Sequence, residues 1–405
     1  MSTAIVTGAT GILGREIVKQ LGKDNKKWKT IHALSRSQKD EYPSNVVHNH
    51  IDLTSSTQDM AKDLKDVKAD YVFFAAYLQK DTEQENWEVN GTMIENFLSA
   101  LEITGAVKDL KRIVLVTGCK QYGVHLGEVK IPMVETDPWL EGEPWPPNFY
   151  YRQQHSLHKF CEKNSHVTWV VTYPNDVIGF AKGNFMNLAT SLALYAAVNK
   201  ELGRDLEFPG NEVFYNKFDC YTSSKIHAEF CEWAALEPKA ANQAFNVHNG
   251  DVESWQNMWP RLARRFGMKV KADQFASPSP KALEQRNKLT DNPPLSVMAE
   301  ELGLNGKIAP SEVANRISLA KWSQQEEVKK AWEKLAQREG LQKDAFEKAT
   351  WAFLDFVLGR SYDIVVSMSK AREFGWTGYY DTWKSLSDVF GELEADKILP
   401  KTHLG

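Results

Sequence analysis

The chain has 405 residues, of which 42% are hydrophobic and 25% charged, and its net charge is −4 at pH 7. This length exceeds that of one compact core, so two domains or one large domain with extensions are expected. The acidic balance argues against a nucleic-acid partner, because such proteins need a basic face to displace counterions from phosphate.

The cysteines and the apolar segments indicate the compartment. Cys119, Cys161, Cys220 and Cys231 have neither CxxC nor zinc spacing, so we expect no metal site and no disulfide framework. The chain enters a predicted strand at once without a signal-peptide pattern, and the apolar run near 188–198 is too short to cross a bilayer. We therefore expect a cytoplasmic protein with a small-molecule substrate and no membrane partner; a homodimer is an open alternative.

The first 180 residues alternate short apolar segments with helical stretches. Strands are predicted at 3–7, 30–34, 46–51, 71–75, 112–117 and 168–172, with a helix at 14–21. Such alternation indicates βαβ units with parallel strands and right-handed crossovers. A late strand at 244–247 is predicted to return to the same sheet. We therefore expect an α/β fold with a doubly wound parallel sheet, in which a Rossmann domain over 1–180 is completed near 240–250.

Beyond residue 180 the pattern becomes mostly helical. Helices are predicted at 185–203, 222–236 and 253–267, and again over 323–358, where apolar residues recur at helical spacing. The intervening stretch, 276–325, begins rich in Pro, Ser and Lys and is predicted to be a loop excursion. Residues 181–240 and 251–405 should thus form a mostly helical substrate-binding cap over the carboxyl edge of the sheet, where ligands bind in open α/β folds.

A glycine-rich segment, 7–14 (TGATGILG), follows the first predicted strand and opens the first helix. This is the context that a dinucleotide fingerprint requires. The first glycine allows a tight turn, the second lets the backbone approach a pyrophosphate, and the third lets the helix pack on the strand, with the anion at the helix N-terminus. The alternative is a glycine turn without a ligand. The predicted cofactor-binding residues here are Gly8, Thr10, Gly11, Ile12, Leu13 and Gly14.

The end of the second predicted strand distinguishes NAD from NADP. NAD enzymes usually carry Asp or Glu there for the ribose 2′-hydroxyl, whereas this chain has Ser35, Arg36 and Ser37. A guanidinium and two hydroxyls suit a 2′-phosphate, although Arg36 could also be a solvated surface charge. Asp52 and Leu53 are predicted to meet the adenine, with a helix cap as the alternative. The sequence therefore predicts NADPH or NADP as cofactor.

The region expected to carry catalysis departs from the common short-chain dehydrogenase pattern, a Tyr with a Lys four residues later. Here Tyr150 is followed at that spacing by Gln154, and Tyr151 by His155. The Ser that usually follows the fifth strand is also absent, and residues 117–123 (TGCKQYG) stand in its place.

Several segments together resemble the progesterone 5β-reductase and iridoid synthase family of short-chain dehydrogenases/reductases. They are 82–86 (TEQEN), 118–122 (GCKQY), 148–151 (NFYY), 195–197 (YAA), 244–247 (AFNV) and 249–252 (NGDV). The resemblance implies that the family's Lys, in the loop after the fifth strand, is Lys120. It also implies that the family's Tyr, the first of a Tyr-Tyr pair, is Tyr150.

The resemblance further implies hydride transfer from NADPH to the β-carbon of an enone or enal. Tyr150 would stabilise the resulting enolate oxygen, and Lys120 would hold Tyr150 and the cofactor and supply positive charge; a phenol and an ammonium suit developing negative oxygen. From the residues alone, Tyr150 could be a packed aromatic and Lys120 a surface charge. The alternative functions are a carbonyl reductase or a non-redox, cyclase-like protein on the same scaffold.

The remaining site residues are also expectations. Cofactor contacts are expected from Ala75, Thr117, Gly118, Lys120, Tyr150, Pro174 and Val177. Substrate contacts are expected from Tyr122, Phe185 and Met186, the last two with core packing as an alternative. The family's Arg-Pro-Gly after the sixth strand is 173–175 (YPN) here, Gln121 replaces a His, and Gln154 and His155 replace acidic residues. Pocket-facing segments therefore differ, and steroid or iridoid activity is not implied.

Overall fold

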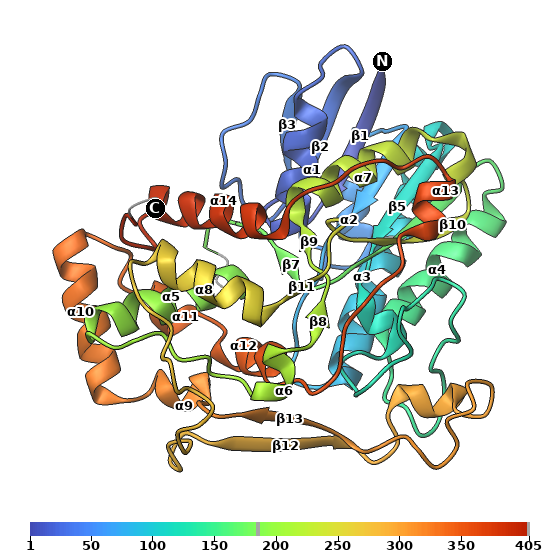
Figure 1. Cartoon of the computed structure of the whole chain (residues 1–405). Helices are drawn as coiled ribbons and strands as arrows, with labels where there is room; N and C mark the ends of the chain where they lie inside the picture. The colour runs from blue at the N-terminus through green and yellow to red at the C-terminus, as the bar shows by residue number, and fades with distance from the viewer. Residues whose placement is uncertain (184–186, 403–405) are drawn as a thin grey trace.

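The computed structural model describes residues 1–183 and 187–402. Its centre is a seven-stranded parallel sheet with the strand order β10-β6-β5-β4-β1-β2-β3 (Figure 1). The strand order reverses between β1 and β4, which is the switch point where ligands bind in such sheets. The predicted α/β doubly wound fold is thus confirmed. The strands are β1 (Ser2–Thr7), β2 (Trp28–Ser35), β3 (Val46–His50), β4 (Tyr71–Phe74), β5 (Arg112–Val116), β6 (Thr168–Pro174) and β10 (Gln243–Val247).

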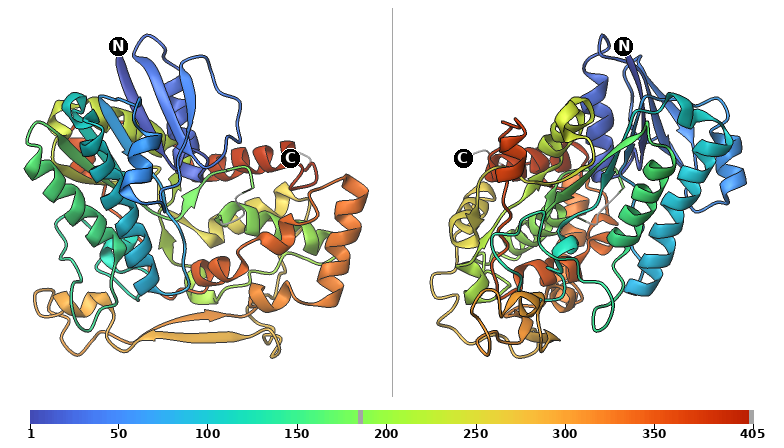
Figure 2. Two further views of the ribbon diagram at one scale, coloured as in Figure 1. Left: turned by 180° about the vertical axis from the view of Figure 1, so that it is seen from behind. Right: turned by 90° about the vertical axis from the view of Figure 1, so that its right-hand side faces the viewer.

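Helices cover both faces of this sheet, as the right-hand view of Figure 2 shows. On one face lie α1 (Ile12–Gly22) and α7 (Ser224–Leu236), and on the other α2 (Thr57–Asp63), α3 (Glu83–Ile103) and α4 (Phe149–Lys163). Successive residues of β1 point to opposite faces: Ala4 and Val6 pack in one core and Ile5 in the other. A strand covered on both faces needs apolar side chains on both, and Ala4, Ile5 and Val6 supply them in the middle of β1.

Two helix starts in the Rossmann part place residues near the site. Thr82 and Glu85 form a capping box at the start of α3, each side chain meeting the other's backbone N–H. Asn148 caps α4 by accepting a hydrogen bond from the backbone N–H of Tyr150. Two segments that carry the family resemblance, 82–86 and 148–151, therefore set where α3 and α4 begin.

The cap has its own apolar core, rich in aromatic side chains such as Tyr195, Trp255 and Trp259. α5 is buried along nearly its whole length, in keeping with its apolar sequence on all sides. The cap helices are α5 (Leu188–Glu201), α6 (Glu212–Tyr215), α8 (Trp255–Arg265), α9 (Leu319–Trp322), α10 (Glu326–Glu339), α11 (Ala345–Lys348), α12 (Trp351–Leu358) and α14 (Thr382–Ala395). Helix α13 (Ser369–Glu373) lies instead beside β10, on the Rossmann part.

Two expectations about the cap need correction. The predicted loop over 276–325 contains an antiparallel pair, β12 (Gln285–Thr290) and β13 (Ser311–Asn315), visible along the lower edge of Figure 1. Its first strand is almost wholly polar, so it lacks the apolar alternation that signals a strand. The helical region 323–358 is not continuous: α10 ends at Gly340, which has φ 65° and closes the helix in the left-handed conformation.

Short elements complete the chain. They are the 3₁₀ helices η1 (Ala106–Asp109), η2 (Cys119–Tyr122), η3 (Pro238–Ala240) and η4 (Pro294–Met298), and the two-residue strands β7 (Val177–Ile178), β8 (Phe218–Asp219), β9 (Thr222–Ser223) and β11 (Glu253–Ser254). Within residues 1–183 and 187–402, no helix has both the length and the apolarity needed to cross a membrane.

Candidate functional site

The glycine segment forms a tight turn between β1 and α1. Gly8 has φ 65°, and a Cβ there would lie 2.6 Å from the carbonyl oxygen of Ala75. The N–H of Gly11 donates to the carbonyl oxygen of Gly8 at 2.8 Å. A Cβ on Gly14 would lie 2.2 Å from the same Gly8 oxygen. Close backbone contact therefore requires glycine at positions 8 and 14, and Gly14 lies beneath the turn and does not line the cleft.

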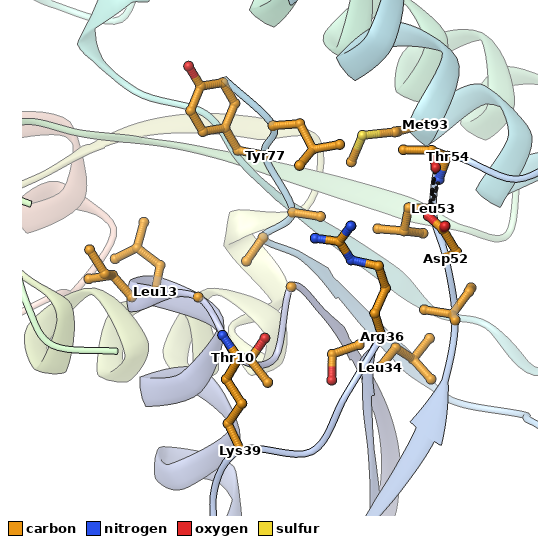
Figure 3. Close-up of a pocket in the computed structure, with 18 of the residues that line it drawn as sticks. Thr10, Leu13, Leu34, Arg36, Lys39, Asp52, Leu53, Thr54, Tyr77 and Met93 are labelled. Atoms are coloured by element: carbon orange, nitrogen blue, oxygen red, sulfur yellow. Dashed lines mark hydrogen bonds between the residues drawn. The ribbon is translucent and has the colours of Figure 1, made fainter. Parts of the chain in front are cut away.

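This turn forms the floor of a cleft of about 690 Å³, which we call the main cleft (Figure 3). It lies at the carboxyl edge of β1, β2 and β4, next to the switch point. Helix α1 has glycine at its N-cap and hence no capping side chain, so its first turn is open to an anion from the cleft. Of the predicted cofactor residues, the main cleft is lined by Gly8, Thr10, Gly11, Ile12, Leu13, Ser35, Arg36, Asp52, Leu53, Ala75 and Val177.

Arg36 marks one end of the main cleft, which we call the Arg36 end. Its guanidinium points into the cleft and its side chain is exposed. The Asp52 carboxylate accepts hydrogen bonds from the backbone N–H and the hydroxyl of Thr54, at 2.9 and 2.7 Å. These bonds, with a smaller effect of Arg36, hold the pKa of Asp52 below its ordinary value. Asp52 thus lines the cleft and also closes the turn after β3.

The hydroxyls of Ser35 and Ser37, next to Arg36, are less available to bind a 2′-phosphate than the sequence suggested. The Ser35 hydroxyl donates to the carbonyl oxygen of Ser37 at 2.9 Å and lies 3.1 Å from Nε2 of His48. Ser37 does not line the main cleft. Lys39, which was not among the predicted residues, also lines the cleft and comes three residues after Arg36 in the same loop. A second cation so close to Arg36 was a signal that could have been used.

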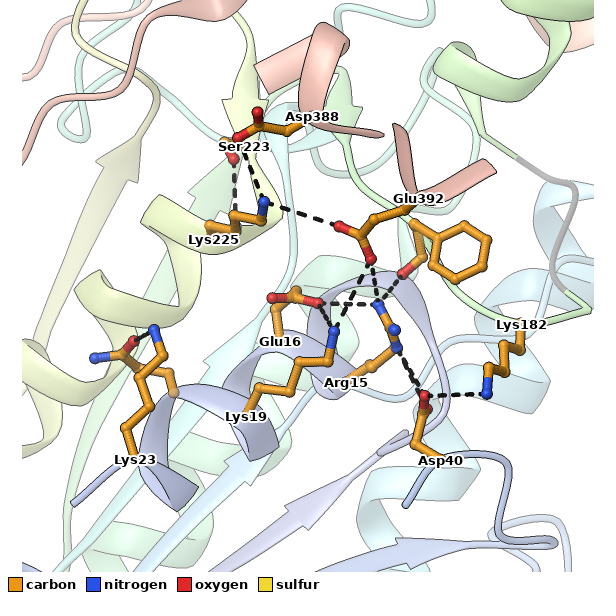
Figure 4. A network of polar contacts seen from close by, with 12 residues as sticks. Arg15, Glu16, Lys19, Lys23, Asp40, Lys182, Ser223, Lys225, Asp388 and Glu392 are labelled. Atoms are coloured by element: carbon orange, nitrogen blue, oxygen red, sulfur yellow. Dashed lines mark hydrogen bonds and ion pairs between the residues drawn. The ribbon is translucent and has the colours of Figure 1, made fainter. Parts of the chain in front are cut away.

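A buried arginine anchors the loop that carries Lys39 (Figure 4). Arg15, on α1, lies 3.2 Å from Asp40 and 3.1 Å from Glu392 of α14, and it donates to the carbonyl oxygen of Phe180 at 3.3 Å. The Lys39 ammonium in turn donates to the carbonyl oxygen of Lys182 at 3.1 Å. The loop after β2, the segment 180–182 and α14 are therefore all fastened to the helix that begins at the glycine turn.

The segments of Lys120 and Tyr150 meet beside the main cleft, in a region that we call the Tyr150 end; four of the predicted cofactor residues, Gly118, Lys120, Tyr150 and Pro174, do not line the cleft itself. One side chain joins their segments: Asn148 accepts from the N–H of Tyr150 at 3.0 Å and donates to the carbonyl oxygen of Lys120 at 2.8 Å. A Cβ on Gly118 would lie 3.1 Å from the Tyr150 hydroxyl and 3.2 Å from the carbonyl oxygen of Pro174. The hydroxyl is thus held over the carboxyl edge of β5 and β6. Asn148 was not among the predicted site residues, although its position just before an expected helix, in NFYY, was a usable signal.

The charges around Tyr150 favour a neutral phenol. Burial raises the pKa of Tyr150 above its ordinary value, and Tyr77, Cys119 and Glu83 add to this effect. The Lys120 ammonium is paired with Glu83 of α3 at 3.1 Å, and both side chains are about 30% exposed. Tyr150 can therefore act as a hydrogen-bond donor, while Lys120 supplies a positive charge fixed by Glu83 rather than by Tyr150.

A chain of aromatic rings links the main cleft to the Tyr150 end. Tyr77, which lines the main cleft, stacks on Phe149 with ring centroids 5.4 Å apart, and Phe149 lies 4.4 Å from Tyr150. Thr117 does not reach the cleft, because its hydroxyl donates to the carbonyl oxygen of Thr172 at 3.1 Å.

Tyr122 faces the interior rather than the main cleft. Its hydroxyl donates to Oδ1 of Asn246 at 2.6 Å, and its ring packs against Tyr173. The physical reason is the 3₁₀ helix η2, in which side chains three residues apart share a face. Cys119 and Tyr122 therefore both point into the core, and Lys120 points away from it. Phe185 and Met186 lie outside the described residues.

The other side chains with metal or redox chemistry are not gathered at this site. The four cysteines are free and buried. Among the residues that the structure describes, no three His, Cys, Asp or Glu side chains are grouped to hold a metal ion.

A sequence profile described as a PRISE-like Rossmann-fold domain matches residues 4–315. The chain belongs to this family. The resemblance inferred from the segments around Lys120 and Tyr150 is thereby confirmed, and the PRISE-like match covers the glycine turn, Arg36, Lys120 and Tyr150 alike.

Relatives of this PRISE-like protein match it over nearly its whole length. An uncharacterized protein of Schizosaccharomyces pombe is 43% identical, with 98% of each chain covered. The (S)-8-oxocitronellyl enol synthase CYC2 of Camptotheca acuminata is 30% identical over 98% of this chain and 93% of its own. The 3-oxo-Δ4,5-steroid 5β-reductase of Arabidopsis thaliana is 28% identical over the same shares. The PRISE-like chain is thus related to reductases of the short-chain type.

Among solved structures, the Bordetella bronchiseptica enzyme WbmG, in complex with NAD and UDP, superimposes with a TM-score of 0.58. It is 13% identical, and 100% of this chain and 99% of that chain are covered. At this identity the likeness concerns the fold alone. The fold of this PRISE-like protein, a Rossmann sheet with a cap, is thus shared along the whole of both chains.

Proposed function

We propose that this protein is an NADPH-dependent reductase of activated C=C bonds in enones or enals. The observation that carries the proposal is the Tyr150 end: a neutral phenol and an ammonium on separate segments, joined by Asn148 beside the main cleft. The printed name of one relative supports it, because a 3-oxo-Δ4,5-steroid has a C=C bond conjugated to a carbonyl. The chain itself is proposed to act on a small molecule of that chemical class.

The residues of the main cleft fit a dinucleotide phosphate. Gly8 and Gly14 allow the backbone turn that a Cβ would block, and the open first turn of α1 suits a pyrophosphate. Arg36, with Lys39 near it, offers positive charge to a 2′-phosphate. The cofactor, when bound, supplies a hydride. Val177 would then border its reactive end, because it lines the cleft and follows Pro174, whose carbonyl oxygen lies next to Gly118 and the Tyr150 hydroxyl.

In this proposal, the Tyr150 hydroxyl binds the carbonyl oxygen of the substrate. As the β-carbon gains a hydride, the C=C electron pair moves toward the carbonyl, whose oxygen becomes an enolate. The Tyr150 hydroxyl donates a hydrogen bond to that oxygen without losing its own proton, since burial opposes a phenolate. A proton from water then completes the product at the α-carbon. A preorganised donor of this kind contributes about 3–4 kcal/mol to the transition state.

Lys120 is assigned an electrostatic role. Its ammonium is held by Glu83, so its charge is positioned by α3 and does not need to touch the phenol. The absence of Lys four residues after Tyr150 or Tyr151 favours this role over the proton relay of ordinary carbonyl reductases.

The test is a panel of enones, enals and saturated ketones with NADPH, followed by product analysis. We expect saturated carbonyl products and loss of NADPH absorbance with the conjugated substrates alone. Alcohol products would contradict the proposal in favour of carbonyl reduction. Product formation without NADPH consumption would contradict it in favour of a non-redox reaction on the same scaffold.

A further inference from the structure

A buried charge cluster lies behind the main cleft. Arg360 lies 2.8 Å from Oδ2 of Asp176 and 3.2 Å from Oδ2 of Asp219, and a second guanidinium nitrogen donates to Oδ1 of Asp176 at 3.0 Å. The three side chains are 3%, 9% and 2% exposed, respectively. Burial, with the neighbouring Asp176 carboxylate, raises the pKa of Asp219. A buried arrangement of this kind is specific in geometry and costly to disturb.

Asp176 holds an unusual backbone conformation next to the cleft. Its φ is +30°, a region that side chains other than glycine rarely adopt and that costs about 1 kcal/mol or more. The next residue, Val177, lines the main cleft and begins β7. The contacts of Asp176 with Arg360 therefore stabilise a strained backbone immediately before a cleft-lining residue.

The residue before Asp176 is held by the same cluster. The Asn175 side-chain amide donates to Oδ1 of Asp219 at 3.0 Å and to the carbonyl oxygen of Cys220 at 2.6 Å. Its backbone N–H donates to the hydroxyl of Thr222 at 2.9 Å. Asn175 and Asp176 are thus both fixed by groups outside their own loop, and Asp219 bridges them through Arg360.

Arg360 itself belongs to the cap. It follows α12 directly, and its guanidinium lies 5.3 Å from the ring centroid of Phe356 and 5.7 Å from that of Phe214. Figure 1 shows α12 close to β8, the strand that carries Asp219. Shortly before α12, Lys348 of α11 lines the main cleft. The segment 348–360 therefore reaches the cleft at its start and the loop 174–177 at its end.

We infer that Arg360 is a positioning residue that couples cap helix α12 to the loop 174–177 and thereby sets the backbone that borders the reactive end of the cofactor. The inference rests on the proposed function in that the cofactor is taken to be a nicotinamide dinucleotide. A guanidinium suits this task because its planar fork engages Asp176 with two nitrogens while one of them also reaches Asp219. A merely structural ion pair would stabilise the cap without changing the cleft.

The experiment compares Arg360→Met with Arg265→Met, a matched control. Arg265 is also a buried cap arginine, 6% exposed and 2.9 Å from Glu394 of α14, but its partners, Glu394 and Ser387, are not among the groups that hold Asn175 and Asp176. Three measurements are made on the full chain: hydrogen exchange of the peptide covering 174–178, binding of adenosine 2′,5′-bisphosphate, and the fluorescence of bound NADPH. None of them requires a substrate, so they separate this inference from the proposed C=C reduction.

For Arg360→Met we expect at least tenfold faster exchange over 174–178, a loss of most of the NADPH fluorescence enhancement, and adenosine 2′,5′-bisphosphate affinity within about threefold of wild type. With an enone substrate, kcat should fall more than tenfold while KM changes less. Arg265→Met should leave all these values unchanged, whatever it does to the melting temperature. Equal effects of the two variants, or unchanged exchange and fluorescence in Arg360→Met, would overturn the inference.

Asp176→Asn gives a second variant in case Arg360→Met fails to fold. Asparagine has the same shape and tolerates positive φ, but it removes the charge that Arg360 holds. We expect the same changes in exchange and fluorescence at roughly a third of the size. Wild-type exchange and fluorescence in folded Asp176→Asn would also overturn the inference.

Discussion

The Arg36 end of the main cleft and the Tyr150 end beside the cleft are built in different ways. The Arg36 end comes from the first 54 residues of the chain, and its charged groups are exposed or engaged in local turns. The Tyr150 end is assembled from η2, α4, the loop after β6 and, behind it, the cap residue Arg360. An exposed charge is screened by solvent and acts on affinity, whereas a buried donor held by several segments acts on the reaction itself. Substitutions at the two ends should therefore change different quantities.

The largest effect is expected from Tyr150→Phe. Removing the hydroxyl removes the donor to the substrate oxygen, so kcat should fall by about 10²–10³-fold, while NADPH affinity, measured by fluorescence titration, stays within about threefold. The adjacent Tyr151→Phe is the control, because that hydroxyl donates to the carbonyl oxygen of Gln121 and accepts from the N–H of Leu140. It should lower the melting temperature and largely preserve kcat. Similar kcat values for Tyr150→Phe and wild type would remove the proposed mechanism.

At the opposite end, Arg36→Ala should change cofactor choice. A charge-assisted contact with a 2′-phosphate is worth about 1.5–3 kcal/mol, so NADPH affinity should fall about 10- to 100-fold while NADH affinity changes little. The difference should shrink at high ionic strength, because the side chain is exposed. Arg286→Ala, at an exposed arginine on β12, is the control. An unaltered ratio of NADPH to NADH affinity would contradict the assignment of Arg36.

A smaller effect is expected from Glu83→Gln. The Lys120–Glu83 pair is partly exposed, and such pairs contribute at most about 1 kcal/mol. Neutralising a carboxylate near the developing oxyanion should raise kcat, by no more than about fivefold. Glu85→Gln, in the same first turn of α3, serves as the control. A clear fall in kcat for Glu83→Gln alone would show that anchoring Lys120 matters more than the local charge.

The smallest effect is expected from pH. Burial raises the pKa of Tyr150, so the phenol keeps its proton as the pH rises through the range in which an ordinary tyrosine ionises. The donor is thus present throughout, and kcat at saturating substrate should stay flat between pH 7 and about 10. A fall in kcat near pH 10 that disappears in Tyr150→Phe would show that Tyr150 has an ordinary pKa. The Tyr150 end would then not differ from the Arg36 end by holding a buried, permanently protonated donor.

The difference between the Arg36 end, built from one stretch of chain, and the Tyr150 end, built from several, also explains which features the sequence could predict. The glycine turn and Arg36 depend on a strand, a turn and a helix that are neighbours in the chain, and the structure places them together as expected. Lys120 and Tyr150 came from a family resemblance, and Asn148 joins the two segments that carry them. The inward orientation of Tyr122 could not be predicted, because it depends on the 3₁₀ geometry of η2 and on Asn246, far away in sequence. Arg360 had no local signal at all, since its partners come from two other segments.

The position of β10 has a consequence for how the chain is made. This strand pairs with β6, yet it is synthesised only after α5, α6 and α7 of the cap and helix layer. Until residue 247 has left the ribosome, the apolar strand β6 has an open edge that invites pairing with other chains. A chain cut between 180 and 243 would keep this edge open, so we expect it to aggregate where the full chain does not.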